Sequence, residues 1–325
     1  MSVAVVTGAS GGIGRATAVA FGRRGWRVAL LARGAEGLAG AQREVEQAGG
    51  EALIIPTDVA DQSAVEAAAA QVEREWGAID VWVNNAMATI FAPVMAVHPE
   101  DFKRATEVTY LGSVWGTLAA LKHMMPRDRG VIVQVGSALA YRSIPLQAAY
   151  CGAKSAVRGF IDSVRCELIH ERSNVRLTHV HLAAFNTPQF DWGRTTLRRK
   201  PMPVGKIFQP EVAAESIYRA AQHPRREVWV GWPAAQAILG QKVLPGYLDR
   251  RLAFEAWEGQ LDNEPIPPGR VDNLYAPVRE DRGAHGRFDA RALPHSMQAW
   301  LNRNRVAVAL GIALPLLALG AMRRR

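Results

Sequence analysis

Apolar runs of strand length alternate with helical stretches along most of this chain of 325 residues. The runs include "VAVVTG" near the start, "RVALLAR", "IDVWVNNA" and "GVIVQVGS", and each is continuously apolar over most of its length. Strands of this kind are buried on both faces, which is typical of a parallel sheet with helices on each side. The alternation therefore predicts a doubly wound α/β fold, in which ligands bind beyond the carboxyl ends of the strands.

A glycine-rich turn, "TGASGGIG" at residues 7–14, follows the first predicted strand and opens the first predicted helix. Gly8 permits a tight turn, while Gly12 and Gly14 let the backbone approach a pyrophosphate that the helix N-terminus stabilises. Its place between a strand and a helix makes this turn a candidate dinucleotide site. The candidate contacts in the turn are Gly8, Ser10, Gly12, Ile13 and Gly14.

Tyr150 and Lys154 lie one helical turn apart in the predicted helix that follows "GVIVQVGS". A phenol has an unperturbed pKa of about 10, so it needs a nearby cation to ionise at neutral pH. Residues i and i+4 share one helix face, which puts the Lys154 ammonium in place to supply that charge. The alternative is an incidental pair of solvated neighbours.

Two further motifs, "NNA" at residues 84–86 and Ser137 before Tyr150, complete a set with a recognisable order. Over residues 1–235 the chain resembles the short-chain dehydrogenases/reductases (SDR), which carry the TGxxxGxG, NNA, Ser and Tyr-x-x-x-Lys motifs in this order. The resemblance implies a Rossmann fold. It also implies that Tyr150 is the general acid/base, that Lys154 holds the nicotinamide ribose, and that Ser137 hydrogen-bonds the substrate oxygen.

Other positions match the cofactor site of that family. The run "VALLAR" places Ala32 and then Arg33 where members that prefer NAD usually carry an acid for the ribose hydroxyls. An arginine suits a 2′-phosphate, so NADP is the preferred cofactor, with NAD as the alternative if Arg33 is merely solvated. The other implied cofactor contacts are Asp58 and Val59 at the adenine, Asn85 and Ala86 in "NNA", Thr187 at the nicotinamide carboxamide, and Tyr150 with Lys154.

Two positions depart from the family pattern. Thr109 in "EVTYLGS" stands where the family has an asparagine that anchors a water-linked proton relay, so a different relay is expected. A threonine hydroxyl still forms hydrogen bonds, but with a different reach and geometry. Ala183 and Ala184 replace the usual Pro-Gly before Thr187, which predicts an altered exit of the following loop from the sheet.

Beyond Thr187 the sequence divides into segments of different character. Residues 188–210 are aromatic, basic and proline-containing with little periodicity, which predicts a lid. A helix and the strand "REVWVGW" then resume the alternation, so that residues 1–260 form the predicted Rossmann-type catalytic domain. Residues 261–305 are rich in Pro, Gly, Arg and Asp, which predicts a linker or mobile arm.

The last segment, residues 306–325, is a predicted apolar tail. Its residues 306–322 include no polar side chain and are bracketed by arginines. A helix of this length spans about 26 Å, slightly less than the hydrocarbon core of roughly 30 Å, and it lacks the polar face of an interfacial helix. The tail therefore predicts a membrane anchor, and the alternative is burial in a dimer partner or in the core.

Charge and cysteine content narrow the remaining classes. The net charge of +9 comes mostly from scattered basic residues without a recognised nucleic-acid module, so no nucleic-acid partner is expected. Cys151 and Cys166 fall in one predicted helix, about 22 Å apart, and this distance excludes a disulfide between them. No signal peptide is recognised, and together these observations favour a reduced, cytoplasmic protein. His179 and His181 share one strand face without an evident third ligand, so no metal is expected.

Together these features predict an oxidoreductase that moves hydride between NADP(H) and a carbonyl or secondary alcohol, with a lipophilic substrate favoured by the apolar lid and tail. Apolar helices around residues 111–121 and 149–168 match the dimer interface of the family and imply a homodimer or homotetramer. One alternative is a nucleotide-binding regulatory or scaffold protein, which Thr109 favours and the Ser, Tyr and Lys set disfavours. Another is a membrane-tethering protein in which activity is incidental.

Overall fold

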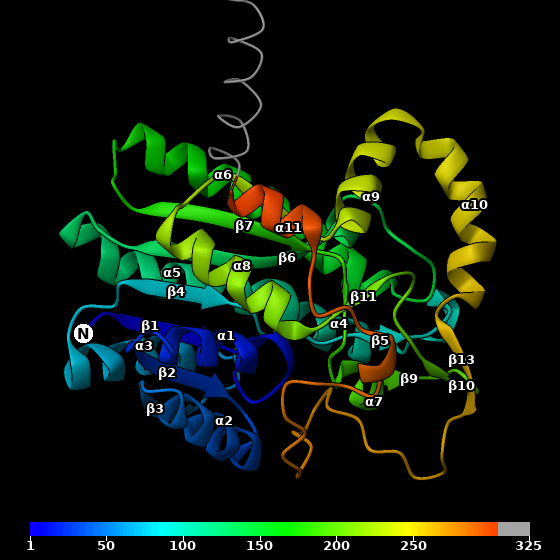
Figure 1. Cartoon of the computed structure of the whole chain (residues 1–325), viewed down its shortest axis with the longest axis horizontal. Helices are drawn as coiled ribbons and strands as arrows, with labels where there is room; N and C mark the ends of the chain where they lie inside the picture. Colours follow the sequence, from blue (N-terminus) through cyan, green and yellow to red (C-terminus); the bar gives the residue numbers. More distant parts are fainter. Residues whose placement is uncertain (305–325) are drawn as a thin grey trace, which may run out of the picture.

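A seven-stranded parallel sheet forms the centre of the protein, whose computed structural model describes residues 1–304 (Figure 1). The strands are β1 (Val3–Thr7), β2 (Arg27–Ala32), β3 (Glu51–Pro56), β4 (Val81–Asn84), β6 (Val131–Ser137), β7 (Arg176–Leu182) and β12 (Glu227–Val230). Their order is β12-β7-β6-β4-β1-β2-β3, so the chain starts inside the sheet, builds one edge and then returns past β1 to build the other. This reversal beside β1 is the switch point at which doubly wound sheets bind ligands.

Helices cover both faces of the sheet. One face carries α1 (Gly12–Gly22), α2 (Ala35–Gln47) and α8 (Pro210–Gln222), and the other carries α3 (Gln62–Trp76), α5 (Gly112–Met124) and α6 (Ala148–His170). In β1, Val3 and Val5 pack into the core on the α6 side, whereas Ala4 and Val6 pack into the core on the α1 side. Burial on both faces explains the continuous apolar runs, and the predicted doubly wound fold is confirmed.

A π-helical turn divides the helical stretch at residues 99–124. It spans Glu107–Leu111, between α4 (Pro99–Thr106) and α5. Thr109 lies in this turn, where its Oγ1 accepts a hydrogen bond from the Ala88 N–H at 2.9 Å and donates one to the Ala88 carbonyl at 3.0 Å. These bonds tie the turn to a residue 21 positions earlier in the chain. Such turns are frequent at functional sites.

The lid predicted at residues 188–210 contains short elements that pair outside the central sheet. These are α7 (Gln189–Trp192), β9 (Arg194–Thr195), β10 (Arg199–Pro201) and β11 (Ile207–Phe208), with the partner strands β5 (Ile90–Phe91), β8 (Ala184–Phe185) and β13 (Leu261–Pro265). β9 pairs with β5, β11 with β8, and β10 with β13. The lid is therefore paired at three places, twice with strands of the domain and once with β13 of the C-terminal extension.

Two helices that the sequence analysis leaves unassigned follow β12. α9 (Trp232–Val243) and α10 (Pro245–Glu258) form a hairpin that projects from the domain (Figure 1). Gly231, with a φ of 89°, turns the chain from β12 into α9. Each helix has a proline in its first turn, where the missing N–H leaves no helical hydrogen bond unmade.

The C-terminal extension packs on the domain. β13 pairs with β10, and α11 (Met297–Arg303) contacts α8 and β12. Between β13 and α11, residues 266–288 form no helix or strand, yet the side chains of Leu274 and Phe288 are buried in hydrophobic clusters of the domain. The arm predicted at residues 261–305 thus lies against the domain as far as the structure describes it.

The membrane anchor predicted at residues 306–322 lies outside the described residues. Within residues 1–304, no helix is both long enough and apolar enough to cross a membrane. The last described helix, α11, ends at Arg303.

Candidate active site

The glycine-rich turn packs on the loop that follows β4. Gly8 has a φ of 68°, and a Cβ at this position would lie 2.9 Å from the Ala86 Cα. Asn85 fastens the two segments, because its N–H donates to the Thr7 Oγ1 at 2.9 Å and its side-chain amide donates to the Thr7 carbonyl at 2.9 Å. Only glycine, which has no Cβ, adopts this left-handed backbone conformation and still lets the Ala86 backbone lie so close. The glycine-rich and "NNA" motifs therefore form one structural unit.

Gly12 and Gly14 shape the start of α1. A Cβ on Gly14 would lie 2.2 Å from the carbonyl oxygen of Gly8, so only glycine fits behind the turn. α1 begins at Gly12 with no side-chain cap and no acidic residue in its first turn. A helix N-terminus of this kind presents backbone N–H donors and the positive end of the helix dipole, which suit an anion. The turn thus fits the phosphates of a dinucleotide.

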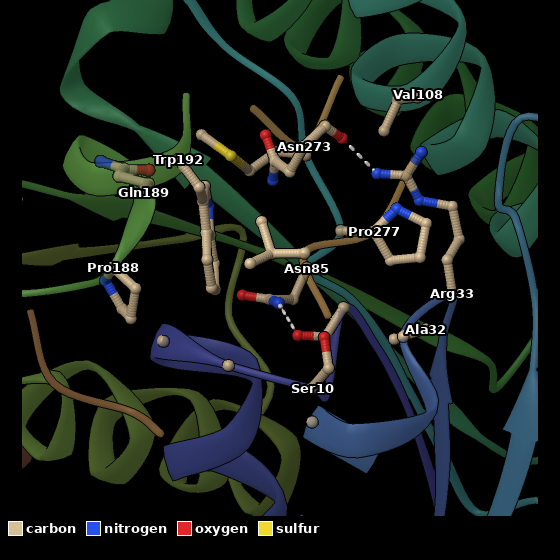
Figure 2. A pocket seen from close by; sticks show the side chains of 18 of the residues that line it. Ser10, Ala32, Arg33, Asn85, Val108, Pro188, Gln189, Trp192, Asn273 and Pro277 are labelled. Atoms are coloured by element: carbon tan, nitrogen blue, oxygen red, sulfur yellow. Dashed lines mark hydrogen bonds between the residues drawn. The ribbon is translucent and has the colours of Figure 1, made fainter. Parts of the chain in front are cut away.

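A cleft at the carboxyl ends of β1 to β4 brings most of the predicted cofactor residues together (Figure 2). The predicted residues that line it are Gly8, Ser10, Gly12, Ile13, Arg33, Asp58, Val59, Asn85, Ala86 and Thr187. Gly14 lies behind the turn, and Ser137, Tyr150 and Lys154 are not part of this lining. Four lining residues that no sequence motif marks come from the C-terminal extension: Asn273, Pro277, Val278 and Glu280.

Arg33 and Asp58, which the resemblance assigns to the adenosine end, both have partners in the chain. The Arg33 guanidinium donates to three successive carbonyl oxygens, those of residues 273–275. Asp58 forms an ion pair with Arg104. Arg33 is therefore a bonded part of the cleft wall, and a ligand at this end meets charged groups that are already hydrogen-bonded.

Ser137 ends β6, and Tyr150 and Lys154 lie on α6. The Lys154 Nζ lies 5.7 Å from the centroid of the Tyr150 ring and donates to the Val135 carbonyl at 2.7 Å. Burial lowers the pKa of Lys154 to about 8. Burial also raises the pKa of Tyr150 above its ordinary value, although a hydrogen bond with Ser137 acts in the opposite direction.

The two pKa shifts bear on the protonation states of Tyr150 and Lys154. The role predicted for Lys154, to favour the phenolate of Tyr150, acts against burial, which raises the pKa of the phenol. Tyr150 therefore holds its proton at neutral pH and can donate it, while Lys154 changes charge close to neutral pH.

Thr109, which the resemblance places where the family has an asparagine, has both its hydroxyl and its carbonyl hydrogen-bonded. The hydroxyl is bonded to Ala88, and the Thr109 carbonyl accepts a hydrogen bond from the Ser113 Oγ at 2.9 Å. The residue is fully buried. Thr109 thus holds the π-helical turn against the loop after β4, and its side chain stabilises the site's framework.

A buried polar cluster that no motif marks lies behind Ser137. The rings of His179 and His181 have centroids 4.0 Å apart, and the His181 Nδ1 lies 3.2 Å from the Ser137 carbonyl oxygen. The Tyr141 hydroxyl donates to Glu227 at 2.6 Å, and His181 Nε2 lies 3.8 Å from the same carboxylate. Burial lowers the pKa of His181 to about 4 despite Glu227, so its imidazole is neutral. The shared face of the two histidines, visible in the sequence, supports the end of β6 at Ser137.

Buried Lys154 predicts a pH-dependent cost to stability. Its pKa falls from an ordinary 10.5 to about 8 on folding, so the folded chain binds fewer protons than the unfolded chain between these values. Stability therefore rises with pH across this window, and the cost is fully present below pH 8. Replacing Lys154 with Met removes the charge. With the bond to Val135 also lost, we expect the free energy of unfolding at pH 7 to rise by about 2 kcal/mol.

Urea unfolding of the wild type and of Lys154→Met at about pH 7 and about pH 10 measures this effect. The difference between the two proteins should be largest at the lower pH and should shrink by more than half at the higher pH. Lys122→Met, which removes an exposed lysine from α5, is the matched control. A lower stability of Lys154→Met at both pH values would contradict the assignment.

Comparison with known proteins defines the class first. The alcohol dehydrogenase from the archaeon Thermococcus sibiricus, complexed with 5-hydroxy-NADP, has a TM-score of 0.61 and 28% identity, covering 71% of this chain and 96% of that one. A metagenomic short-chain oxidoreductase in complex with NADP has a TM-score of 0.60 and 30% identity, covering 70% and 96%. The fold is that of Rossmann-fold oxidoreductases.

Sequence comparison then gives the family. The model described as short chain dehydrogenase matches residues 2–195. The uncharacterized oxidoreductase YxnA of Bacillus subtilis (strain 168) is 34% identical over 276 residues, which cover 84% of this chain and 77% of that protein. The uncharacterized oxidoreductase Rv1543 of Mycobacterium tuberculosis is 33% identical over 255 residues, covering 76% and 72%. The chain belongs to the short-chain dehydrogenase/reductase family of oxidoreductases, as its motifs predict.

Proposed function

We propose that this oxidoreductase acts with NADP(H) on a carbonyl or secondary alcohol. The observation that carries the proposal is the Tyr150 and Lys154 pair on α6, together with Ser137, in a chain whose cleft gathers the predicted dinucleotide contacts. A bound nicotinamide cofactor supplies or accepts the hydride. The NADP and 5-hydroxy-NADP complexes of the two similar structures support this cofactor class.

The chain's own residues bind the substrate oxygen and move the proton. The Ser137 Oγ accepts from the Leu139 N–H at 3.1 Å, and its hydroxyl, which is hydrogen-bonded with Tyr150, turns to the substrate oxygen when a substrate enters. Tyr150, kept neutral by burial, gives its proton to a carbonyl oxygen, or takes one from an alcohol in the reverse direction. The positive charge of Lys154 then stabilises the phenolate that remains.

The proposal is tested by mixing the purified protein with NADPH or NADP⁺ and a panel of ketones and alcohols graded in chain length. Turnover on any member supports the reaction class. The lid's buried apolar side chains, Phe190 and Ile207, cluster with Phe91 and Phe288 and support a lipophilic substrate. On that view kcat/KM rises with chain length, and equal values along the series would argue against it.

We propose a preference for NADP(H) because Arg33 lines the cleft at the end of β2. Arg33→Ala is expected to lower the ratio of kcat/KM for NADPH over that for NADH by about tenfold, because a guanidinium binds a phosphate through charge-assisted hydrogen bonds. Steady-state kinetics with both cofactors measures the ratio. Arg129→Ala removes an exposed arginine distant from the cleft lining and is the matched control. Equal losses with both cofactors would show that Arg33 does not read the 2′-phosphate.

The second candidate is a nucleotide-binding regulatory or scaffold protein on the same fold. Thr109 favours this candidate, because its hydroxyl is hydrogen-bonded to Ala88 and its carbonyl to Ser113. The side chain at the family's relay position is therefore already bonded within the chain. Tight NADP(H) binding without turnover across the whole panel would support this candidate over the first.

Assembly and anchoring stay predictions. Exposed Leu118 on α5 and Ile169 on α6 support a homodimer or homotetramer through these helices. Sedimentation of the full chain measures the assembly, and carbonate-resistant pelleting before and after deletion of residues 306–325 tests the anchor.

A further inference from the structure

The C-terminal extension crosses the cofactor cleft. Residues 270–287, here called the strap, lie between β13 and α11 and contact both the glycine-rich turn and the lid. Within the strap, Asn273 and Pro277 line the cleft, with Asn273 on the opposite side from Ser10 (Figure 2). The strap is therefore part of the wall that a dinucleotide would contact.

The strap takes a backbone donor at the start of α1. The N–H of Gly12 donates to the carbonyl oxygen of Gly283 at 3.1 Å. This N–H belongs to a helix terminus that has no side-chain cap, and in Rossmann folds such a terminus binds the pyrophosphate. A phosphate oxygen that takes this hydrogen must displace the Gly283 carbonyl.

An ion pair fixes the strap beside that donor. Arg15 of α1, which is 3% exposed, pairs with Asp281 of the strap and with Glu44 of α2, the latter at 2.8 Å. Burial alone would raise the pKa of Asp281, but its hydrogen bond with Arg15 holds the pKa below its ordinary value. Asp281 is therefore ionised at neutral pH, and its attraction to Arg15 holds the segment that carries Gly283.

The strap also takes the charged group at the adenosine end. The Arg33 guanidinium donates to the carbonyl oxygens of residues 273–275. The Arg104 Nε donates to the Leu274 carbonyl at 3.3 Å. The group proposed to bind the 2′-phosphate is thus bonded to the strap, as is the backbone donor proposed for the pyrophosphate.

The strap is joined to the lid as well. The N–H of Asn273 donates to the Trp192 carbonyl at 2.9 Å, and Arg270 donates to the carbonyls of Asp191 and Gly193, each at 2.8 Å. Trp192 in turn packs on the glycine-rich turn, since a Cβ on Gly11 would lie 2.9 Å from its ring. Movement of the strap therefore involves the lid that borders the same cleft.

We propose that the strap competes with the dinucleotide for Gly12 and Arg33, so that residues 281–283 leave the glycine-rich turn and residues 273–275 release Arg33 when the cofactor binds. The inference rests on the proposed function for the identity of that ligand. In this arrangement the strap sets both the affinity for the cofactor and the rate of its exchange.

Asp281→Asn tests the competition, because it removes the charge that holds the strap and keeps the size of the side chain. We expect this variant to bind NADP⁺ with a dissociation constant roughly fivefold lower than the wild type, the scale of one partly exposed ion pair. Glu44→Gln is the matched control, since it removes an equal charge from the same arginine without touching the strap. Its dissociation constant should stay within about twofold of the wild type. Isothermal titration calorimetry with NADP⁺ measures all three proteins.

Hydrogen exchange of the wild-type chain gives a readout independent of the variants. Saturating NADP⁺ should speed exchange of the amides in residues 281–286 while slowing exchange in the glycine-rich turn. Slower exchange in both segments, or an Asp281→Asn variant that binds NADP⁺ no better than the wild type, would overturn the competition and leave the proposed function intact. If none of the three proteins binds NADP⁺ or NAD⁺, the proposed function fails and the strap inference fails with it.

Discussion

Tyr150→Phe is expected to lower kcat by about a thousandfold, the scale of a positioned general acid or base, while leaving the dissociation constant for NADP⁺ close to that of the wild type. Phe keeps the ring that lies 5.7 Å from the Lys154 Nζ and removes only the hydroxyl that carries the proton. Steady-state turnover on the best substrate of the panel gives kcat, and calorimetry gives the dissociation constant. The separation of the two quantities distinguishes lost proton transfer from a damaged site.

The matched control is Tyr218→Phe on α8. Tyr218 packs edge-on against Phe21 with ring centroids 5.0 Å apart, and it packs against the core on the opposite face of the sheet from Tyr150. This variant should keep the wild-type kcat. A Tyr150→Phe enzyme as fast as the control would exclude Tyr150 as the proton donor.

Gly14→Ala is expected to lower the free energy of unfolding by about 3 kcal/mol, the upper part of the usual range for an overpacked site, and to abolish binding of NADP⁺. The added Cβ would lie 2.2 Å from the Gly8 carbonyl oxygen and 2.5 Å from the Asn85 side-chain amide. Neither backbone nor bonded amide can give way without moving the glycine-rich turn. Urea unfolding measures the stability, and calorimetry measures the binding.

Gly159→Ala is the control for the helical glycine. Gly159 lies on α6, and beyond the adjoining backbone of that helix no atom lies within 4 Å of an added Cβ. Alanine should therefore raise the free energy of unfolding by up to about 1 kcal/mol through helix propensity. Opposite signs for the two substitutions would confirm that the packing behind the turn, rather than helix propensity, decides the result. Equal stability changes would refute it.

The fold could be predicted because its signals are local. Each strand of the sheet is marked in the sequence by a continuous apolar run, as β1 is by Val3 to Val6. Because these strands are buried on both faces, helices must cover the sheet on each side, and the sequence places such helices between the strands. The π-helical turn could not be predicted in this way. Thr109 in this turn is bonded to Ala88, and a sequence period does not connect these two residues.

In the candidate site, too, the features set by local sequence could be predicted, and those set by contacts between distant residues could not. The spacing of Tyr150 and Lys154 fixes a shared helix face, and the glycine-rich turn fixes a helix start, so both were open to prediction. The direction of the Tyr150 pKa was not, because burial depends on the surrounding fold. The strap was hidden for a different reason. Its composition is that of a linker, and its bonds, such as that between Asp281 and Arg15, join residues far apart in the chain.

The strap is anchored on both sides, by β13 on the lid and by α11 on α8 and β12. The Gly283 carbonyl is therefore a tethered competitor, whose effective concentration at Gly12 depends on chain length and stiffness and is on the order of millimolar for short flexible tethers. Dilution of the protein does not weaken such a competitor. The fraction of clefts that hold NADP(H) then depends on the free concentration of NADP(H) relative to the effective concentration of the Gly283 carbonyl. It does not depend on the concentration of the protein.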